Sequence, residues 1–378
     1  YLATISFLKS NYFFGPDKQT ISSGAYPDIL PNKDVTWETS EQLDLGLDAR
    51  FFGGRLGLSF DYYLKTTKDW LVQAPILDSY GTSAPYINGG DVRNQGIEMA
   101  LNWNDHVGDF TYGVNLNLSH NKNEVTRIAN SEGIIHGSPN ILSEGTTEMY
   151  RAQEGYPIGY FYGYKTLGVF QSEKQIAEYS GAKLSGTAPG DLIFADTNKD
   201  GVIDDNDKCM IGNPHPDVIM GLTFNLGYKG FDLGITTNAV LGNQIARSYR
   251  SFADQPKENY TTDILGRWHG EGTSNRLPRV ASGTNTNWLY ISDIFIEDGD
   301  YFRIQNVTLG YDFKKLFPRI PLGQARLYVT AQNLATFTKY SGMDPEIGYG
   351  ADKSWVSGID VGFYPSPRTY MVGVNLKF

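Results

Sequence analysis

Apolar and polar residues alternate over much of this chain. Between residues 55 and 65, every second position is apolar, starting at Leu56 and ending at Leu64. Successive side chains on a β-strand point to opposite faces, so this pattern predicts a strand with one apolar and one polar surface. The same alternation predicts strands over residues 42–51, 97–103, 111–119, 220–229, 231–239 and 369–378.

The alternation slips once, in the segment that starts near Phe302. Phe302 and Ile304 keep one phase, whereas Val307, Leu309 and the apolar residues after them follow one position later. One extra residue near positions 305 and 306 would produce this shift. The slip therefore predicts a β-bulge within a single strand.

The predicted strands are joined by connections of two lengths. Short links occur at residues 53–54, 104–109, 229–230 and 314–324, and long stretches at 66–92, 121–156, 171–219, 242–300 and 338–368. Short turns at one end and long loops at the other are typical of an outer-membrane barrel, whose long loops lie outside the cell. We count about ten to twelve strands, of which the ambiguous segment 148–170 supplies one or two. Residues 175–179 and 261–268 are predicted to form short loop helices.

Composition narrows the class of protein. The net charge of -10 argues against a nucleic-acid partner, because such binders need a basic surface. The single cysteine, Cys209, excludes an intrachain disulfide. No run of about 18 apolar residues is present, but a transmembrane strand needs only about ten residues with every second one apolar. The sequence begins at Tyr1 inside a patterned segment, which we interpret as a fragment or a processed piece.

Several strings resemble a known family when taken in order. They are DVTWETSEQLDLGLDARFF, RLGLSFDYYLKTTKDWLVQ, VRNQGIEMALNW, DTNKDGVIDDNDKCMIGNPHPDVIMGLTFNLGYKGFDLGI, DGDYFRIQNVTLGYDF, RLYVTAQNLATFTKYSGMDPE and PSPRTYMVGVNLKF. Together they resemble the C-terminal portion of SusC/RagA-type TonB-dependent outer-membrane transporters of Bacteroidetes. The resemblance runs over nearly the whole chain.

This resemblance implies an all-β fold, a transmembrane antiparallel β-barrel of roughly 22 strands. Residues 1–378 would form about half of its wall, while the plug domain and the N-terminal strands would lie in an N-terminal part of the same transporter. The implied function is import of a nutrient, first a glycan or oligosaccharide and second a peptide. The implied partners are a SusD-like lipoprotein, TonB acting through the N-terminal part, and the lipid bilayer. The alternative is a secreted all-β carbohydrate-active enzyme or binding module.

The sharpest local motif is an acidic loop after residue 195. An EF-hand-type loop supplies oxygen ligands to Ca²⁺ at positions 1, 3, 5, 7, 9 and 12, with glycine at position 6. Gly201 holds the glycine position, and position 12 is aspartate instead of the usual glutamate. The sequence therefore predicts a structural calcium site, although a solvated acidic turn without an ion would also fit. The candidate ligands are Asp196, Asn198, Asp200, the carbonyl of Val202, Asp204 and Asp207.

Signals for catalysis are weak, and we nominate no catalytic residue and no substrate-binding residue. The five histidines lack metal-ligand spacing. Four aromatic residues in long segments fit either contact with a sugar or peptide, or packing within loops or anchoring at the membrane interface. The terminal Phe378 fits an assembly signal as well as a strand end. The histidines are His106, His120, His136, His215 and His269, and the aromatic residues are Trp288, Tyr290, Tyr349 and Trp355.

Overall fold

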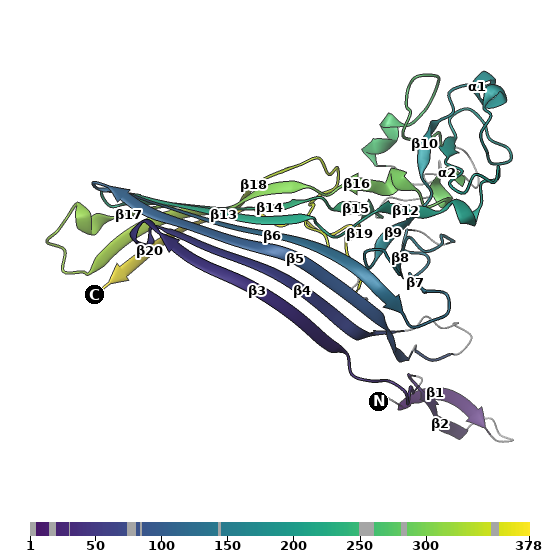
Figure 1. Cartoon of the computed structure of the whole chain (residues 1–378), viewed down its shortest axis with the longest axis horizontal. Helices are drawn as coiled ribbons and strands as arrows, with labels where there is room; N and C mark the ends of the chain where they lie inside the picture. The colour runs from purple at the N-terminus through teal and green to yellow at the C-terminus, as the bar shows by residue number, and fades with distance from the viewer. Residues whose placement is uncertain are drawn as a thin grey trace.

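A large curved antiparallel sheet dominates the computed structural model of the chain (Figure 1). The structure describes residues 5–14, 20–29, 31–73, 81–83, 85–142, 145–248, 261–280, 286–348 and 355–378. The sheet has nine strands in the order β20-β18-β17-β14-β13-β6-β5-β4-β3. These strands are β3 (Thr39–Phe51), β4 (Leu56–Gln73), β5 (Tyr86–Val107), β6 (Phe110–Ile128), β13 (Val218–Tyr228), β14 (Phe231–Leu241), β17 (Tyr301–Asp312), β18 (Gln324–Thr338) and β20 (Thr369–Lys377).

The connections are sorted by length, as the sequence predicted. At one end, β3 meets β4 through the 3₁₀-helix η1 (Phe52–Gly54), and β17 meets β18 after η6 (Phe313–Lys315). Lys229 and Gly230 turn between β13 and β14 with positive φ angles of 47° and 95°, which favours glycine at the second position. The opposite end carries the long connections, which gather on the right of Figure 1.

Three strands run further than the sequence pattern predicted. β4 extends to Gln73, β5 starts at Tyr86, and β6 extends to Ile128, so parts of the segments 66–92 and 121–156 are strand and not loop. The alternation is hidden there because Val92 and Val125 lie on the polar face, where a small apolar cluster covers them. These positions carry apolar residues instead of the expected polar ones, because another part of the chain buries them.

The predicted bulge is confirmed in β17. Asn306 pairs with Thr236 of β14, whereas Ile304 pairs with the next residue, Thr237. Gln305 is therefore the extra residue in the ladder. The insertion keeps Ile304 and Val307 on the same apolar face, which explains the slip in the sequence pattern.

The long connections fold into a cap of small sheets beside the end of the wall (Figure 1). Two apolar clusters form its core, the larger around Trp288, Phe295 and Phe161 and the smaller around Trp70 and Val125. The segment 148–170 contributes to the cap and not to the wall. The sheets of the cap contain β7 (Ile134–His136), β8 (Tyr150–Gln153), β9 (Tyr160–Gly163) and β12 (Cys209–Gly212); β10 (Thr166–Val169) and β11 (Leu192–Phe194); and β15 (Gln244–Arg247), β16 (Ile296–Asp298) and β19 (Ile359–Asp360).

The remaining elements are few. β1 (Ile5–Phe14) and β2 (Thr20–Pro27) pair only with each other among the described strands, so the wall has nine strands instead of the ten to twelve that we counted. Helix α1 (Glu173–Glu178) and the 3₁₀-helix η4 (Thr262–Gly266) match the two predicted loop helices. The others are α2 (Thr286–Leu289), η3 (Asp205–Asp207) and η5 (Asp293–Phe295). None of the helices in the described part of the chain is long and apolar enough to cross a membrane.

Candidate functional site

The two faces of the wall have opposite chemistry. Leu116 of β6 lies between Leu101 of β5 and Leu222 of β13, and this apolar face continues across the sheet to Val374 of β20. Val374 is 61% exposed, and many other large apolar side chains of the strands are exposed as well. A soluble sheet would cover such a surface, so this face requires a nonaqueous neighbour.

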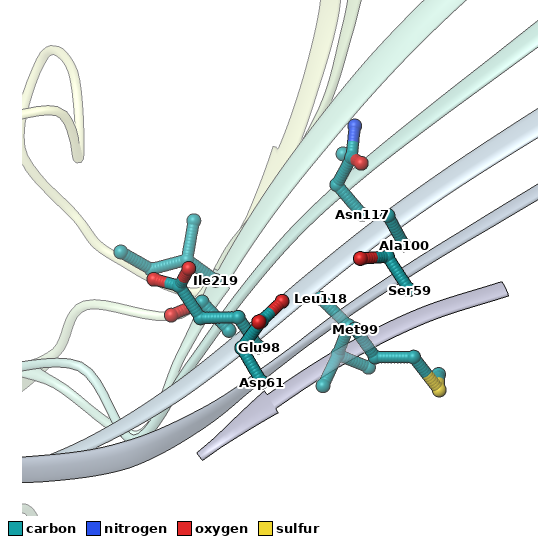
Figure 2. A pocket seen from close by; sticks show the side chains of 10 residues that line it. Ser59, Asp61, Glu98, Met99, Ala100, Asn117, Leu118 and Ile219 are labelled. Carbon is teal, nitrogen blue, oxygen red and sulfur yellow. The ribbon is translucent and has the colours of Figure 1, made fainter. Parts of the chain in front are cut away.

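The other face is polar and carries a shallow depression of about 300 Å³. Asp61 of β4 pairs with Glu98 of β5, and both side chains lie on this face of the sheet (Figure 2). Asn117 of β6 lines the same depression, together with Ser59. Carboxylates on neighbouring strands favour the access of water or cations, which reduces the repulsion between their charges. This face is therefore suited to line an aqueous interior.

Close packing of side chains shapes this depression. A Cβ atom on Gly46 of β3 would lie 2.3 Å from Oδ1 of Asp61, so the side chain of Asp61 occupies the space that glycine leaves. Ser59 donates a hydrogen bond of 2.7 Å to Oδ1 of Asp48. The carboxylates are consequently held along the sheet surface, and the space in front of them stays open.

The cap packs onto the far end of the polar face. The amide of Ile158 donates to Oδ1 of Asn123 at 2.8 Å, and the amide of Val125 donates to the carbonyl of Tyr156 at 2.8 Å. Trp355 contacts Trp70 of β4 edge-on, with ring centroids 6.0 Å apart. These contacts fix the connections over the polar side of the strand ends.

The acidic loop lies between β11 and β12 and is organised by its own side chains. Oδ2 of Asp196 accepts from the amide of Gly201 at 2.9 Å, and Oδ1 of Asn198 accepts from the amide of Asp200 at 3.0 Å. Oδ1 of Asp200 accepts from the amide of Val202 at 2.9 Å. The first half of the candidate ligand set is thus brought together on one exposed turn.

The second half of the loop has another role. Asp207 is fully buried, and its two carboxylate oxygens accept from the amides of Thr197 and Asp204 at 2.8 and 2.9 Å. The carboxylate of Asp204 accepts from the amide of Asn206, which caps η3. Asp207 therefore anchors the loop. Among the described residues, no group of three or more His, Cys, Asp or Glu side chains is arranged to hold a metal ion.

The chemistry of the loop nevertheless suits a hard cation. Its donors are carboxylates, one side-chain amide and a backbone carbonyl, the oxygen ligands that Ca²⁺ prefers. Gly201 has a φ of 86°, which supplies the sharp turn at the sixth position. Asp196, Asn198 and Asp200 would have to turn their oxygens inward, because they now bond the backbone of the loop.

The aromatic candidates serve mainly as packing residues. Trp288 is buried in the cap, Tyr290 stacks on Tyr164 with centroids 5.1 Å apart, and Trp355 also packs edge-on against Tyr150. The packing alternative is therefore correct for these three. Tyr349 lies outside the described residues. The five histidines do not form a cluster, and Phe378 follows β20 with an exposed ring.

Sequence reasoning missed two buried ion networks. Arg303 of β17 contacts Asp344 and Glu346, and Arg247 of β15 contacts Asp263 and Glu297. The partners lie between 16 and 50 residues from their arginine along the chain. In the sequence, each network is visible only as an arginine near the end of a strand. Such arginines are too common to indicate a buried ion pair.

Comparison with known proteins agrees with this architecture. The family described as "TonB dependent receptor-like, beta-barrel" matches residues 8–334. TonB-dependent receptor P3 of Formosa agariphila is 36% identical, over 99% of this chain and 37% of its own length. TonB-dependent receptor SusC of Bacteroides thetaiotaomicron is 31% identical, over 92% of this chain and 32% of its own length. The chain thus spans about a third of the length of these relatives.

Solved structures support the fold. The structure of the RagAB peptide transporter matches all of this chain and 38% of that chain, with a TM-score of 0.77 and 21% identity. The same importer in its "open-open" state gives a TM-score of 0.73. The matching family is one of receptors and transporters and not of enzymes. This chain therefore belongs to the TonB-dependent receptor-like β-barrel family, is of the SusC/RagA type, and resides in the bacterial outer membrane.

Proposed function

We propose that the chain forms part of the wall and the outer cap of a transporter that imports a nutrient across the outer membrane. The observation that carries this proposal is the two-faced sheet, whose exposed apolar side suits lipid and whose polar side suits a water-filled path. Energy would come from TonB, which would act through an N-terminal part of the same transporter. The chain itself would carry out no covalent chemistry.

The proposed cargo is an oligosaccharide, captured together with a SusD-like surface lipoprotein. Sequence similarity to SusC supports this choice over most of the chain. A peptide is the second candidate, because a solved structure that matches the whole chain is described as a peptide transporter. Measurements of uptake have to decide between these two classes of cargo.

The test is uptake by cells that carry or lack the complete transporter gene. We expect the deletion strain to lose uptake of at least one labelled compound from a panel of oligosaccharides and peptides. Deletion of TonB should abolish the same uptake, and restoring the gene should recover it. Unchanged uptake of the entire panel in the deletion strain, or uptake that does not need TonB, would refute the proposal.

The alternative, a secreted all-β enzyme or binding module, makes a different physical prediction. Such a protein would bury the apolar face in its own core and would stay soluble without detergent. The exposed leucines and valines of β3 and β20 speak against it, since a core would cover them.

We also propose that the acidic loop binds a structural Ca²⁺ through Asp196, Asn198, Asp200, the Val202 carbonyl and Asp204, with Asp207 holding the loop in place. The oxygen-only donor set and the Gly201 turn support the proposal. Asp196 and Asp200 carry like charges on one turn, and a cation would relieve their repulsion. The ion would stiffen a long connection on the outer side of the membrane.

A further inference from the structure

A second cavity, of about 380 Å³, lies in the cap and shares no lining residue with the polar depression or with the acidic loop. Arg247 of β15, Glu297 of β16 and Lys339, directly after β18, contribute to its lining. β15 and β16 pair with each other in the cap, and the amide of Ser341, three residues after β18, donates to Glu297 of β16. Arg276, from the connection between β14 and β17, lines it as well.

Both carboxylates of this cavity are already committed to one cation. Nη2 of Arg247 lies 2.5 Å from Oδ2 of Asp263, and Nη1 lies 3.3 Å from Oε1 of Glu297. Ser341 joins the same network, because Arg247 donates to its hydroxyl at 2.6 Å and its own amide and hydroxyl donate to Glu297 at 2.9 and 2.8 Å. The Arg247 side chain is only 9% exposed, so this network is a fixed part of the cavity. Its single cation offsets one of the two carboxylates, so the network keeps one negative charge.

Two further cations line the cavity without such compensation. Arg276 and Lys339 are exposed, and neither forms an ion pair with an Asp or Glu of the described residues. Leu277 and the buried Ile294 supply an apolar part of the lining. The lining therefore has three cations and two carboxylates, an excess of one positive charge, beside an apolar surface, in a chain whose net charge is -10.

We infer that this cavity binds a carboxylate-bearing ligand, with its carboxylate at Arg276 and Lys339 and its carbon skeleton against Leu277 and Ile294. A guanidinium matches a carboxylate with two parallel hydrogen bonds, and an ammonium adds a point charge. Asp263 and Glu297 both contact Arg247, which offsets one of their two negative charges, and the two cations Arg276 and Lys339 outweigh the other. This inference rests on the proposed import function only in naming the ligand as cargo, an acidic oligosaccharide or an acidic peptide.

The competing explanation is that Arg276 and Lys339 are ordinary solvated surface cations. Such cations would attract any anion weakly and without regard to its shape. Equilibrium binding to the complete transporter, purified in detergent, separates the two explanations. The probes are digalacturonic acid against its neutral methyl ester, and a Glu-Glu dipeptide amide against a Gln-Gln dipeptide amide.

We expect one acidic probe to bind at least about tenfold more tightly than its neutral counterpart, with an affinity that falls as salt rises. Which acidic probe binds identifies the source of the carboxylate. The double variant Arg276→Gln, Lys339→Gln should lose about tenfold or more in affinity, as expected for lost charged hydrogen bonds. Lys339→Arg keeps the charge and should retain binding. Lys174→Gln is the matched control, because Lys174 is an exposed lysine on α1 that does not line the cavity.

Three results would overturn the inference: no binding of either acidic probe, equal binding of the neutral counterparts, or an unchanged affinity in a double variant that still migrates as a folded barrel. The measurement needs neither TonB nor uptake. A transporter that imports a neutral compound but ignores both acidic probes would therefore refute this inference and leave the proposed function intact. Conversely, a transporter that binds an acidic probe as expected but imports none of the compounds would refute the proposed function and leave this inference intact.

Discussion

Arg303 of β17 donates through Nη2 to Oδ1 of Asp344, at 2.5 Å, and both side chains are almost entirely buried. The same guanidinium donates to Glu346 at 2.6 Å and to the hydroxyl of Thr336 at 2.9 Å. Asp344 in turn accepts from the amide of Ser366 at 3.1 Å. A single arginine on the wall thus pins both ends of the connection between β18 and β20.

Replacing Arg303 by Gln should loosen this connection. Asp344 would be left buried without its cation, and breaking a buried pair in this way costs about 3–5 kcal/mol. We expect faster hydrogen exchange in residues 339–348 and 355–368 of the complete transporter. Arg326→Gln is the matched control, because Arg326 pairs with Asp232 near the end of the wall that carries the short turns. Equal exchange in both variants would show that Arg303 does not hold the connection.

The two faces of the wall should respond differently to charge. Leu116→Arg or Val374→Arg should cost about 2–4 kcal/mol of folding free energy if the site lies near the bilayer midplane, because the arginine would face hydrocarbon. Reversible unfolding of the complete transporter in lipid vesicles measures this cost.

The controls are the sequence neighbours Asn117→Arg and Asn375→Arg on the polar face. Asn117 lies opposite Ala100 and Gly221, which leave room for a longer side chain. We expect only a mild effect there. Equal destabilisation on both faces would indicate a water-excluding core on each side, contrary to a barrel wall.

Much of the wall was predictable from local pattern. Alternation identified the strands from Leu56 to Val374, and the phase slip at Gln305 located the bulge, because both signals depend only on neighbours in sequence. The ends of β4, β5 and β6 that approach the cap were not predictable. Val92 and Val125 interrupt the polar face because distant cap residues cover them, and no local pattern reports such a contact.

The same reasoning applies to the cap. The loop from Asp196 to Asp207 was visible as a string because its contacts are local. The Arg247 and Arg303 networks were invisible, since their partners come together only after the chain has folded.

Calcium should protect the acidic loop. Asp200→Asn removes one proposed ligand and should weaken binding, in a site whose dissociation constant we expect in the roughly 10⁻⁴–10⁻³ M range of extracellular modules. Terbium luminescence and the rate of proteolysis within residues 196–207, with and without chelator, measure occupancy and its effect. Asp205→Asn is the control, because Asp205 bonds Tyr164 and Lys208 and is not a proposed ligand. If chelator leaves proteolysis of the wild-type loop unchanged, the turn is a solvated turn without an ion.

His136 should make the β7–β8 pair sensitive to pH. Partial burial opposes its charge, but Glu148 and Glu132, whose oxygens lie 3.0 and 3.1 Å from its ring nitrogens, outweigh burial and raise the pKa of His136. The charged imidazole thus favours the folded state. Its contribution is fully present below the ordinary pKa of about 6.5 and is lost as pH rises through the raised value.

We therefore expect protection of the β7–β8 amides, corrected for intrinsic exchange, to fall as pH rises through this window. His136→Gln should remove the dependence, whereas His106→Gln, near the turn between β5 and β6, should leave it in place. A flat profile in the wild-type protein would contradict the charge assignment at His136.

The two outer strands of the wall should find their neighbours in the N-terminal part of the transporter. Among the described strands, β3 and β20 each have one neighbour in the sheet, and they do not pair with each other. The free edge on the N-terminal side of the sheet is β3, because β1 pairs with β2 and not with the wall among the described strands. Unpaired N–H and C=O groups facing hydrocarbon cost several kcal/mol each, so both edges need partners in the membrane.

In the complete transporter, the β20 amides that face away from β18 should therefore exchange as slowly as those that face it. In residues 1–378 produced alone in detergent, the outward amides of β20 should exchange fast, while both sets in β18 stay protected because β18 lies between β17 and β20. The isolated chain should also fail to migrate as a compact heat-modifiable barrel on a gel. Closure of this chain alone into a small barrel, with β3 paired to β20, would contradict the prediction, since no edge would then remain for other strands.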